Sequence, residues 1–175
     1  MEKYKLIQFS PEEYREIMKA KDYFLKKGDR GNPPKFLVIC GPVGTGKTRL
    51  RRGKYQEGYV VIDEGDIYAR LKPILISDEK YADFIDFVIA NLIREAIVGR
   101  KNILIEVLMD KMEPIKTIMN KMIALGYKTE IEYIHNDIAK SWENNISRGK
   151  DNISAYYSQN NLFRLILNYF EENKN

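Results

Sequence analysis

The sequence contains almost none of the residues that build disulfide or zinc scaffolds. Its one cysteine, Cys40, excludes an intramolecular disulfide framework, and its one histidine, His135, argues against a Cys/His zinc site. It also lacks a run of about 18 apolar residues, the length that a membrane-spanning helix needs. The first residues do not form the apolar core of a signal peptide. We therefore expect a cytoplasmic protein without a membrane partner.

A large excess of charge of one sign is missing as well. The chain has 29 basic and 25 acidic residues, a formal net charge of +4, which is too small to bind nucleic acid by charge alone. The charge therefore does not select a partner. A length of 175 residues with 44% hydrophobic residues is ordinary for one globular domain. We expect residues 1–175 to form a single domain.

Glycine and proline divide the chain into alternating helical and strand-like blocks, without internal repeats. Apolar runs predict buried strands at 36–40, 59–62 and 103–105, and an alternating run predicts an edge strand at 127–134. Helical spacing predicts helices at 10–27, 81–97, 115–125, 138–146 and 162–170. This pattern predicts an α/β fold, a three-layer sandwich of about four mostly parallel strands with helices on both faces. We expect the strand order to be 2-3-1-4.

One segment matches the phosphate-binding pattern G-x-x-x-x-G-K-[ST] between a predicted strand and a helix-compatible segment. It consists of Gly41, Pro42, Val43, Gly44, Thr45, Gly46, Lys47 and Thr48. Its glycines let backbone N–H groups point at phosphate oxygens, and the helix N-terminus adds partial positive charge. Lys47 reaches the terminal phosphates, Thr48 can ligate Mg²⁺, and Arg49 extends the nucleotide-binding set. The sequence therefore predicts a P-loop NTPase fold that binds ATP or GTP with Mg²⁺.

The carboxylates after the next strands separate the functional classes. In a motor or switch ATPase, Asp63 would bind Mg²⁺ and Glu64 would activate water. The short spacing from Lys47 to Asp63, however, leaves room for only one short helix, which is less than a motor usually has. In a kinase, Asp63 and Asp66 would lie where a phosphoryl acceptor approaches, with Glu106 at the end of the third strand. A carboxylate there can take the proton of an attacking hydroxyl.

Simpler alternatives stay open at this stage. Asp66 is also placed to be the N-cap of a helix over 67–70, and Asp63 to hold a water on Mg²⁺. A non-catalytic nucleotide-binding module would use the phosphate-binding loop alone. The sequence by itself therefore allows a kinase, a hydrolase or a binding module.

Basic residues gather in two segments. A phosphotransferase needs basic side chains on a segment that covers the transferring phosphate, and residues 143–158 are the candidate lid, with Arg148 first and Lys150 second. A second basic run follows the phosphate-binding loop, and we interpret it as the exposed face of a helix rather than a nucleic-acid patch. This run consists of Arg49, Arg51, Arg52 and Lys54.

Taken together, these motifs resemble the zeta-toxin and polynucleotide-kinase branch of the small P-loop kinases over most of the chain. The segments that carry the resemblance are FLVICGPVGTGKTRLR, GYVVIDEGDIY, NILIEV and ALGYKTEIEYIHNDIAKSWENNISRG. The resemblance implies that Lys47 and Thr48 bind ATP and Mg²⁺ and that Asp66 is the catalytic base. It also implies that Asp63, Glu106 and Arg70 bind the substrate and that Arg148 stabilises the transferring phosphate.

The resemblance also implies an acceptor and a partner. The acceptor would be a UDP-N-acetyl amino sugar, as for zeta toxins, or the 5′-hydroxyl of a nucleic acid. The opening segment SPEEYREIMKAKDYFLKKGD is similar to a zeta-toxin helix near the antitoxin-binding face. An antitoxin protein is therefore a candidate partner.

Overall fold

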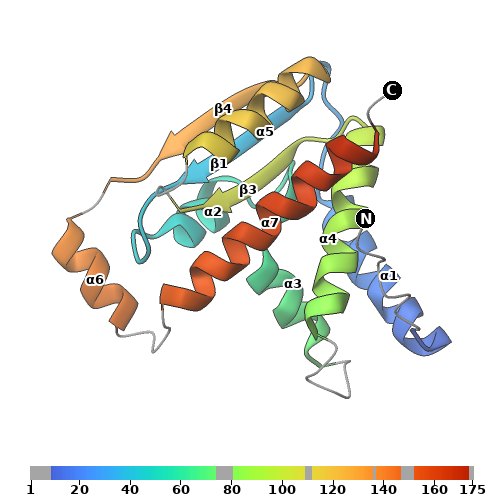
Figure 1. Cartoon of the computed structure of the whole chain (residues 1–175), viewed down its shortest axis with the longest axis horizontal. Coiled ribbons are helices and arrows are strands. Elements are labelled where there is room, and N and C mark those ends of the chain that lie inside the picture. Colours follow the sequence, from blue (N-terminus) through green and yellow to red (C-terminus); the bar gives the residue numbers. More distant parts are fainter. Residues whose placement is uncertain (1–8, 74–80, 109–111, 136, 147–151, 174–175) are drawn as a thin grey trace.

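The computed structural model describes residues 9–73, 81–108, 112–135, 137–146 and 152–173 (Figure 1). Its strands are β1 (Lys35–Cys40), β2 (Val60–Ile62), β3 (Ile103–Val107) and β4 (Lys128–Tyr133). Its helices are α1 (Pro11–Lys26), α2 (Lys47–Lys54), α3 (Glu64–Leu71), α4 (Tyr81–Val98), α5 (Met112–Ala124), α6 (Ile138–Ile146) and α7 (Asn152–Glu172). Every predicted strand and helix is present within one or a few residues of its predicted bounds, except that α7 begins well before residue 162.

All four strands run parallel, in the order β2-β3-β1-β4. This confirms the predicted sheet and its strand order. β4 lies at the edge of the sheet, as its alternating sequence indicates. Because the strands are parallel, the carboxyl ends of β1, β2 and β3 meet at one edge of the sheet. This edge is where ligands bind in open α/β sheets.

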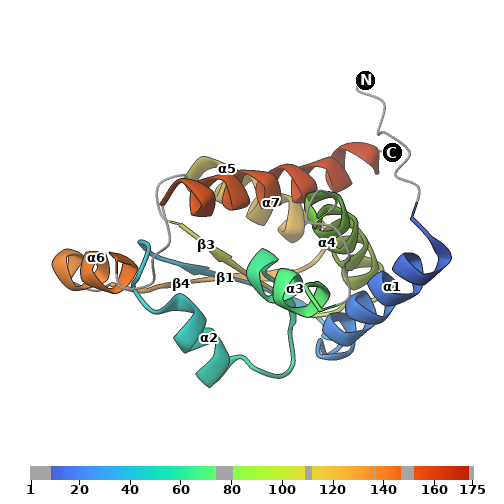
Figure 2. The same ribbon diagram turned by 90° about the horizontal axis from the view of Figure 1, so that it is seen from below.

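Helices cover both faces of the sheet and make the three layers that the sequence predicts. Figure 2 shows α2 on one face and α5 and α7 on the other. The larger cluster of buried residues packs the sheet against α4, α5 and α7, together with α1 and α3. A smaller cluster, which includes Leu37, Ile39 and Leu104, lies under Leu50 of α2. The alternating side chains of β1 thus enter two separate cores.

The first residues of α1 and of α7 differ in how clearly their sequences predict a helix. α1 begins with a capping box, in which the Ser10 hydroxyl accepts from the Glu13 N–H at 3.1 Å and the Glu13 carboxylate accepts from the Ser10 N–H at 2.8 Å. The first half of α7 is mostly polar in sequence. It therefore carries no apolar periodicity that would predict a helix.

Among the described helices, none combines the length and the apolar character that crossing a membrane would require. α6 stands apart from the sheet at the side of β4 (Figure 1). Its connection to the rest of the fold within the described residues includes a hydrogen bond from Asn144 Nδ2 to the carbonyl oxygen of Gly44, at 3.2 Å. α6 is therefore tied to the loop that follows β1.

Candidate active site

The loop between β1 and α2 has the strand–loop–helix context that the phosphate-binding pattern requires. Gly46 lies at the N-cap of α2 with a φ of 93°, a left-handed conformation that favours glycine. The Lys47 ammonium donates to the carbonyl oxygens of Gly41 and Pro42, both at 2.9 Å. Lys47 therefore lies over the loop, where a bound phosphate would take its charge. The loop residues that the sequence singled out lie together at the carboxyl end of β1.

Thr48, in the first turn of α2, reaches the neighbouring strand. Glu106 of β3 lies beside Ile39 of β1 in the sheet register, and its Oε2 accepts a hydrogen bond from Thr48 Oγ1 at 2.9 Å. The Glu106 side chain is only 8% exposed. The structure thus places Glu106, which the resemblance assigned to the substrate, directly against the predicted metal ligand Thr48.

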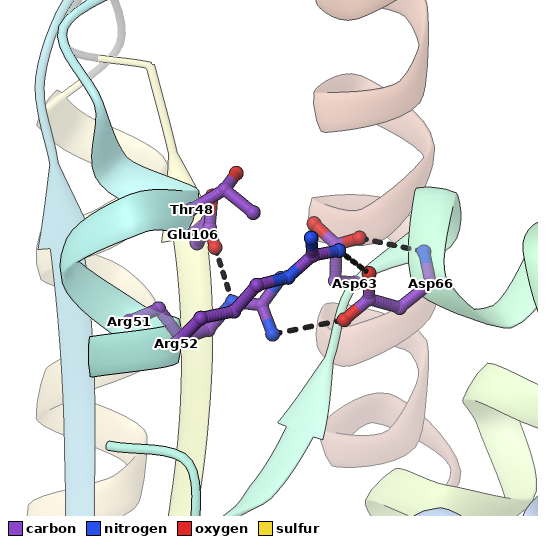
Figure 3. A network of polar contacts seen from close by, with 6 residues as sticks. All are labelled: Thr48, Arg51, Arg52, Asp63, Asp66 and Glu106. Carbon is purple, nitrogen blue, oxygen red and sulfur yellow. Dashed lines mark hydrogen bonds and ion pairs between the residues drawn. The ribbon is translucent and has the colours of Figure 1, made fainter. Parts of the chain in front are cut away.

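Arg51 joins this pair to Asp66 of α3 (Figure 3). Its Nε donates to Glu106 Oε1 in a short contact, and its Nη1 donates to Asp66 Oδ2 at 2.8 Å. The second oxygen of Asp66 accepts from Arg52 Nη2, also at 2.8 Å. Thr48, Glu106, Arg51 and Asp66 therefore form one continuous polar network across α2, β3 and α3.

The buried position of Arg51 corrects the interpretation of the basic run. Arg49, Arg52 and Lys54 are exposed, as expected for the outer face of a helix. Arg51 is only 4% exposed, so for this residue the interpretation is wrong. Arg51 lies three positions after Thr48 and so shares its face of α2, which is turned toward the carboxylates of β3 and α3. That spacing was the one sequence signal that could have found it.

The alternative role of Asp66 as a helix N-cap is also wrong, because α3 begins earlier than 67. Asp63 is the N-cap of α3, and its Oδ1 accepts from the Asp66 N–H at 2.8 Å. Asp66 lies in the first turn of the helix, with its carboxylate on the two arginines. Asp63 therefore caps the helix, and the Asp66 carboxylate contacts α2 instead.

The two aspartates differ in their electrostatics. Burial raises the pKa of Asp63, and the nearby negative charge of Glu106 raises it further. Burial also acts to raise the pKa of Asp66, but the charges and hydrogen bonds of Arg51 and Arg52 outweigh it, so this pKa is lowered. Environments that push the pKa values of neighbouring carboxyls apart are a mark of acid–base sites. The lowered pKa keeps Asp66 ionised at neutral pH.

A magnesium ion fits the oxygen donors of this site. Thr48, Asp63 and Glu106 offer a hydroxyl and two carboxylates, the hard ligands that Mg²⁺ prefers. Within the described ranges, no group of three or more His, Cys, Asp or Glu side chains is arranged to hold a metal by itself.

A cavity of about 390 Å³ opens beside Asp66 between α1, α2 and α3; we call it the acceptor-side cavity. Lys27, Arg51, Arg52 and Arg70 line it, and Asp66 is its one acidic residue. The Tyr23 ring holds two of these cations, with Arg70 Cζ 4.3 Å and Lys27 Nζ 4.4 Å from its centroid. In the described part of the chain, neither of these two pairs with a carboxylate.

A larger cavity of about 860 Å³ lies on the other side of α2 and reaches the phosphate-binding loop at Gly44 and Gly46. Arg49 of α2 and Asn144 of α6 also line it, together with the end of β4. The rings of Tyr133 and His135 stack there, 6.2 Å apart. Its contact with the loop makes this cavity the candidate site for the nucleoside of a bound triphosphate.

The predicted site residues are thus largely brought together. The structure places Lys47, Thr48, Asp63, Asp66 and Glu106 at one edge of the sheet, and Arg70 lines the acceptor-side cavity. Arg148 and Lys150 lie outside the described residues, as does the middle of the predicted lid 143–158. Their roles stay predictions. Sequence reasoning missed the places of Arg51, Lys27 and Tyr23, which depend on packing between helices.

Comparison with known proteins gives one family and a set of similar folds. The family model for zeta toxin matches residues 20–172. No curated protein matches the chain. A structure from the PezAT chromosomal toxin–antitoxin system of Streptococcus pneumoniae has a TM-score of 0.61 at 19% identity. The match covers 81% of this chain, which spans 64% of the length of that structure.

Two further structures are less similar. One is described as the Pnkp1/Rnl/Hen1 complex, with a TM-score of 0.43, 17% identity, and coverage of 66% of this chain and 40% of that one. The other is the DnaC helicase loader, with a TM-score of 0.35, 19% identity, and coverage of 73% and 92%. At these identities, the likeness to solved structures concerns the fold alone.

Proposed function

The chain belongs to the zeta toxin family, and from this membership and the site geometry we propose that it transfers the γ-phosphate of ATP to a hydroxyl acceptor. The observation that carries the proposal is the network of Figure 3, which links Thr48 of the phosphate-binding helix to Asp66 beside a basic cavity. A nucleotide site and an ionised base are thus next to each other. That is the arrangement that transfer to a hydroxyl needs.

The nucleotide side is formed by the loop and the first turn of α2. Backbone N–H groups of Gly44 and Gly46 and the Lys47 ammonium would hold the phosphates. Thr48, with Asp63 and Glu106 nearby, would hold Mg²⁺, which neutralises negative charge on the phosphates when bound. The cavity at α6 supports placing the nucleoside there. GTP in place of ATP would use the same phosphate contacts.

Asp66 is the base in this proposal. Arg51 and Arg52 keep its carboxylate ionised at neutral pH, so it can accept the proton of an acceptor hydroxyl as the hydroxyl oxygen attacks the γ-phosphorus of ATP. The bond from that phosphorus to the oxygen bridging to the β-phosphate breaks, and ADP leaves. Two oxygens with about four lone-pair directions leave room for that proton beside the two arginine bonds. The Arg51 bond also fixes the carboxylate at the mouth of the acceptor-side cavity.

The acceptor-side cavity fits an acceptor that carries phosphate. Lys27 and Arg70 face it without carboxylate partners in the described ranges, and the Tyr23 ring between them offers an aromatic surface. A UDP-N-acetyl amino sugar and the 5′ end of a nucleic acid both place phosphates near a hydroxyl group. The zeta toxin membership favours the first of these two acceptors.

The similarity to a toxin–antitoxin structure also bears on partners. We include in the proposal an antitoxin protein that binds near α1, the helix that contributes Tyr23 to the acceptor-side cavity. A partner on α1 would lie next to the acceptor site. Such a protein would be expected to block transfer when it is bound.

The testing experiment measures transfer of label from γ-labelled ATP with Mg²⁺. UDP-N-acetylglucosamine and a 5′-hydroxyl oligonucleotide are offered in parallel, with Lys47→Ala as the control. Labelling of one acceptor by the native chain and not by the variant supports the proposal and selects the acceptor. Labelled free phosphate at the same rate with and without acceptors would contradict it and favour the hydrolase that uses Asp63 and Glu64.

A further inference from the structure

The Arg51 side chain reaches both halves of the site. α2 carries it three positions after Thr48, and it is buried. Its Nε bonds Glu106, which in turn accepts from Thr48, while its Nη1 bonds Asp66 at 2.8 Å. Nothing in the phosphate-binding pattern assigns a role to this position. The geometry nevertheless makes Arg51 the link between the magnesium side and the acceptor side.

The shape of the guanidinium explains what this link can do. Its five N–H groups point in fixed directions in one plane. Bonds from Nε to Glu106 and from Nη1 to Asp66 therefore set the separation of two carboxylates that belong to different elements, β3 and α3 (Figure 3). A lysine ammonium carries the same charge but lacks the rigid fork. Only an arginine can hold both carboxylates in this relation.

The remaining nitrogen of the guanidinium supports a functional reason for the residue. Nη2 is buried and has no hydrogen-bond partner among the residues that the structure describes. It shares one edge of the planar group with Nε and another with Nη1, and so lies between the two bound carboxylates. Because an unpaired buried donor is costly, stability alone does not explain an arginine here. Nη2 is therefore a buried donor left over beside the two nitrogens that hold Glu106 and Asp66.

We propose that Arg51 is a positioning residue that holds Glu106 against Thr48 and Asp66 against the acceptor-side cavity at a fixed separation. The inference rests on the proposed function, because the two sides that Arg51 joins are the magnesium–nucleotide side and the acceptor side of that reaction. Arg51 acts through the two carboxylates. Its loss should therefore weaken Mg²⁺-dependent binding and transfer without removing the phosphate-binding loop.

The variants that test this are Arg51→Lys, Arg51→Gln and the matched control Arg52→Gln. Arg52 bonds the same Asp66, its side chain is 65% exposed, and within the described residues no hydrogen bond or ion pair joins it to Glu106. The first readout requires no turnover: ATP affinity is measured by calorimetry once with Mg²⁺ and once with EDTA. The second readout is kcat and KM with the acceptor that the native chain labels.

Mg²⁺ should raise the ATP affinity of the native chain, and in both Arg51 variants this gain should be about 10- to 100-fold smaller. Removal of a residue that orients a metal ligand typically has an effect of this size. The affinity of both variants for ATP in EDTA should stay within about threefold, because the loop and Lys47 are intact. Their kcat should fall about 10- to 100-fold while the acceptor KM changes little. Arg52→Gln should keep the gain in affinity from Mg²⁺. If Arg51 only stabilised the fold, its replacement would lower the ATP affinity with Mg²⁺ and the ATP affinity in EDTA by the same factor.

If Arg51→Gln does not fold, Arg51→Lys alone tests whether Arg51 positions the two carboxylates. A lysine variant with native Mg²⁺-dependent affinity and native kcat would overturn the proposal, as would an Arg52→Gln variant that loses as much of the Mg²⁺ effect. If the native chain labels no acceptor, the proposed function fails. The calorimetric comparison then still supports or overturns the role of Arg51 on its own.

Discussion

The Oδ1 atom of Asp63 accepts a hydrogen bond from the backbone N–H of Asp66, at 2.8 Å. One candidate acid thus caps the helix that carries the other. Because the cap fixes the first turn of α3, the Asp66 carboxylate is directed at Arg51 and Arg52 of α2. Asp63 itself is buried near the negative charge of Glu106, and these two effects raise its pKa although the hydrogen bond from the Asp66 N–H acts to lower it.

Asp63→Asn should therefore raise stability at neutral pH while it lowers activity. Asparagine keeps an oxygen for the cap and removes a buried charge. The raised pKa of Asp63 in the fold means that its ionised form costs stability above that pKa, and that this cost disappears below 3.8, the value of the unfolded chain. Urea unfolding at several pH values should show an upward shift of the midpoint at pH 7 that shrinks toward pH 4. A less stable variant at pH 7 would show that the charge of Arg51 favours ionised Asp63.

Lys47→Ala should remove nearly all transfer without unfolding the chain. In the structure the Lys47 ammonium donates to the carbonyl oxygens of Gly41 and Pro42, in the loop rather than in either hydrophobic cluster, so its removal should leave the core intact. Loss of one preorganised charge on the transferring phosphate typically costs about 10²- to 10³-fold in rate. The matched control is Lys116→Ala on α5, an exposed lysine far from the loop in sequence and paired with Glu113. Equal activity of the two variants would contradict the site assignment.

Asp66→Asn and Glu64→Gln separate a kinase from a hydrolase. Loss of the base should lower acceptor-dependent transfer by about 10²- to 10⁴-fold. Glu64→Gln should have a small effect, because the Glu64 carboxylate accepts a hydrogen bond from Asn161 of α7, at 3.4 Å, and glutamine keeps an oxygen for that bond. Release of phosphate without acceptor, measured for both variants, gives the comparison. Hydrolysis that Glu64→Gln abolishes and Asp66→Asn spares would reverse the assignment.

Arg70→Ala should weaken acceptor binding more than it slows transfer. Arg70 lines the acceptor-side cavity against the Tyr23 ring, and a charged hydrogen bond to a phosphate is worth about 1.5–3 kcal/mol. The acceptor KM should rise about tenfold or more, with kcat within about threefold. Lys72→Ala, two positions later and outside the cavity lining, is the control. An equal rise in the acceptor KM for Lys72→Ala would contradict a direct contact of Arg70 with the acceptor, because it would show that loss of any positive charge at the end of α3 has the same effect.

Much of the fold could be read from local patterns. The apolar runs at β1 and β3 and the alternating run at β4 predict the strands, and the alternation of β4 also predicts its place at an edge of the sheet. Periodicity does not place β2, whose residues are all buried although it forms the other edge. The first half of α7 escaped because its polar residues carry no such period. Helical spacing therefore detects the half of a helix whose apolar residues recur with the helical period and misses the half whose sequence is mostly polar.

For the candidate site, too, some features could be predicted from the sequence and others could not. The sequence by itself determined the phosphate-binding loop, with Lys47 and Thr48, and the carboxylates just after β2 and near the end of β3, since these depend on residue type and spacing along one chain segment. Only the tertiary structure decided that Arg51 is buried while its neighbour Arg52 is exposed, that Asp63 rather than Asp66 caps α3, and that Glu106 meets Thr48. The physical reason is that a side chain's partners on other elements depend on packing and desolvation. Those arise only when α2, α3 and the sheet come together.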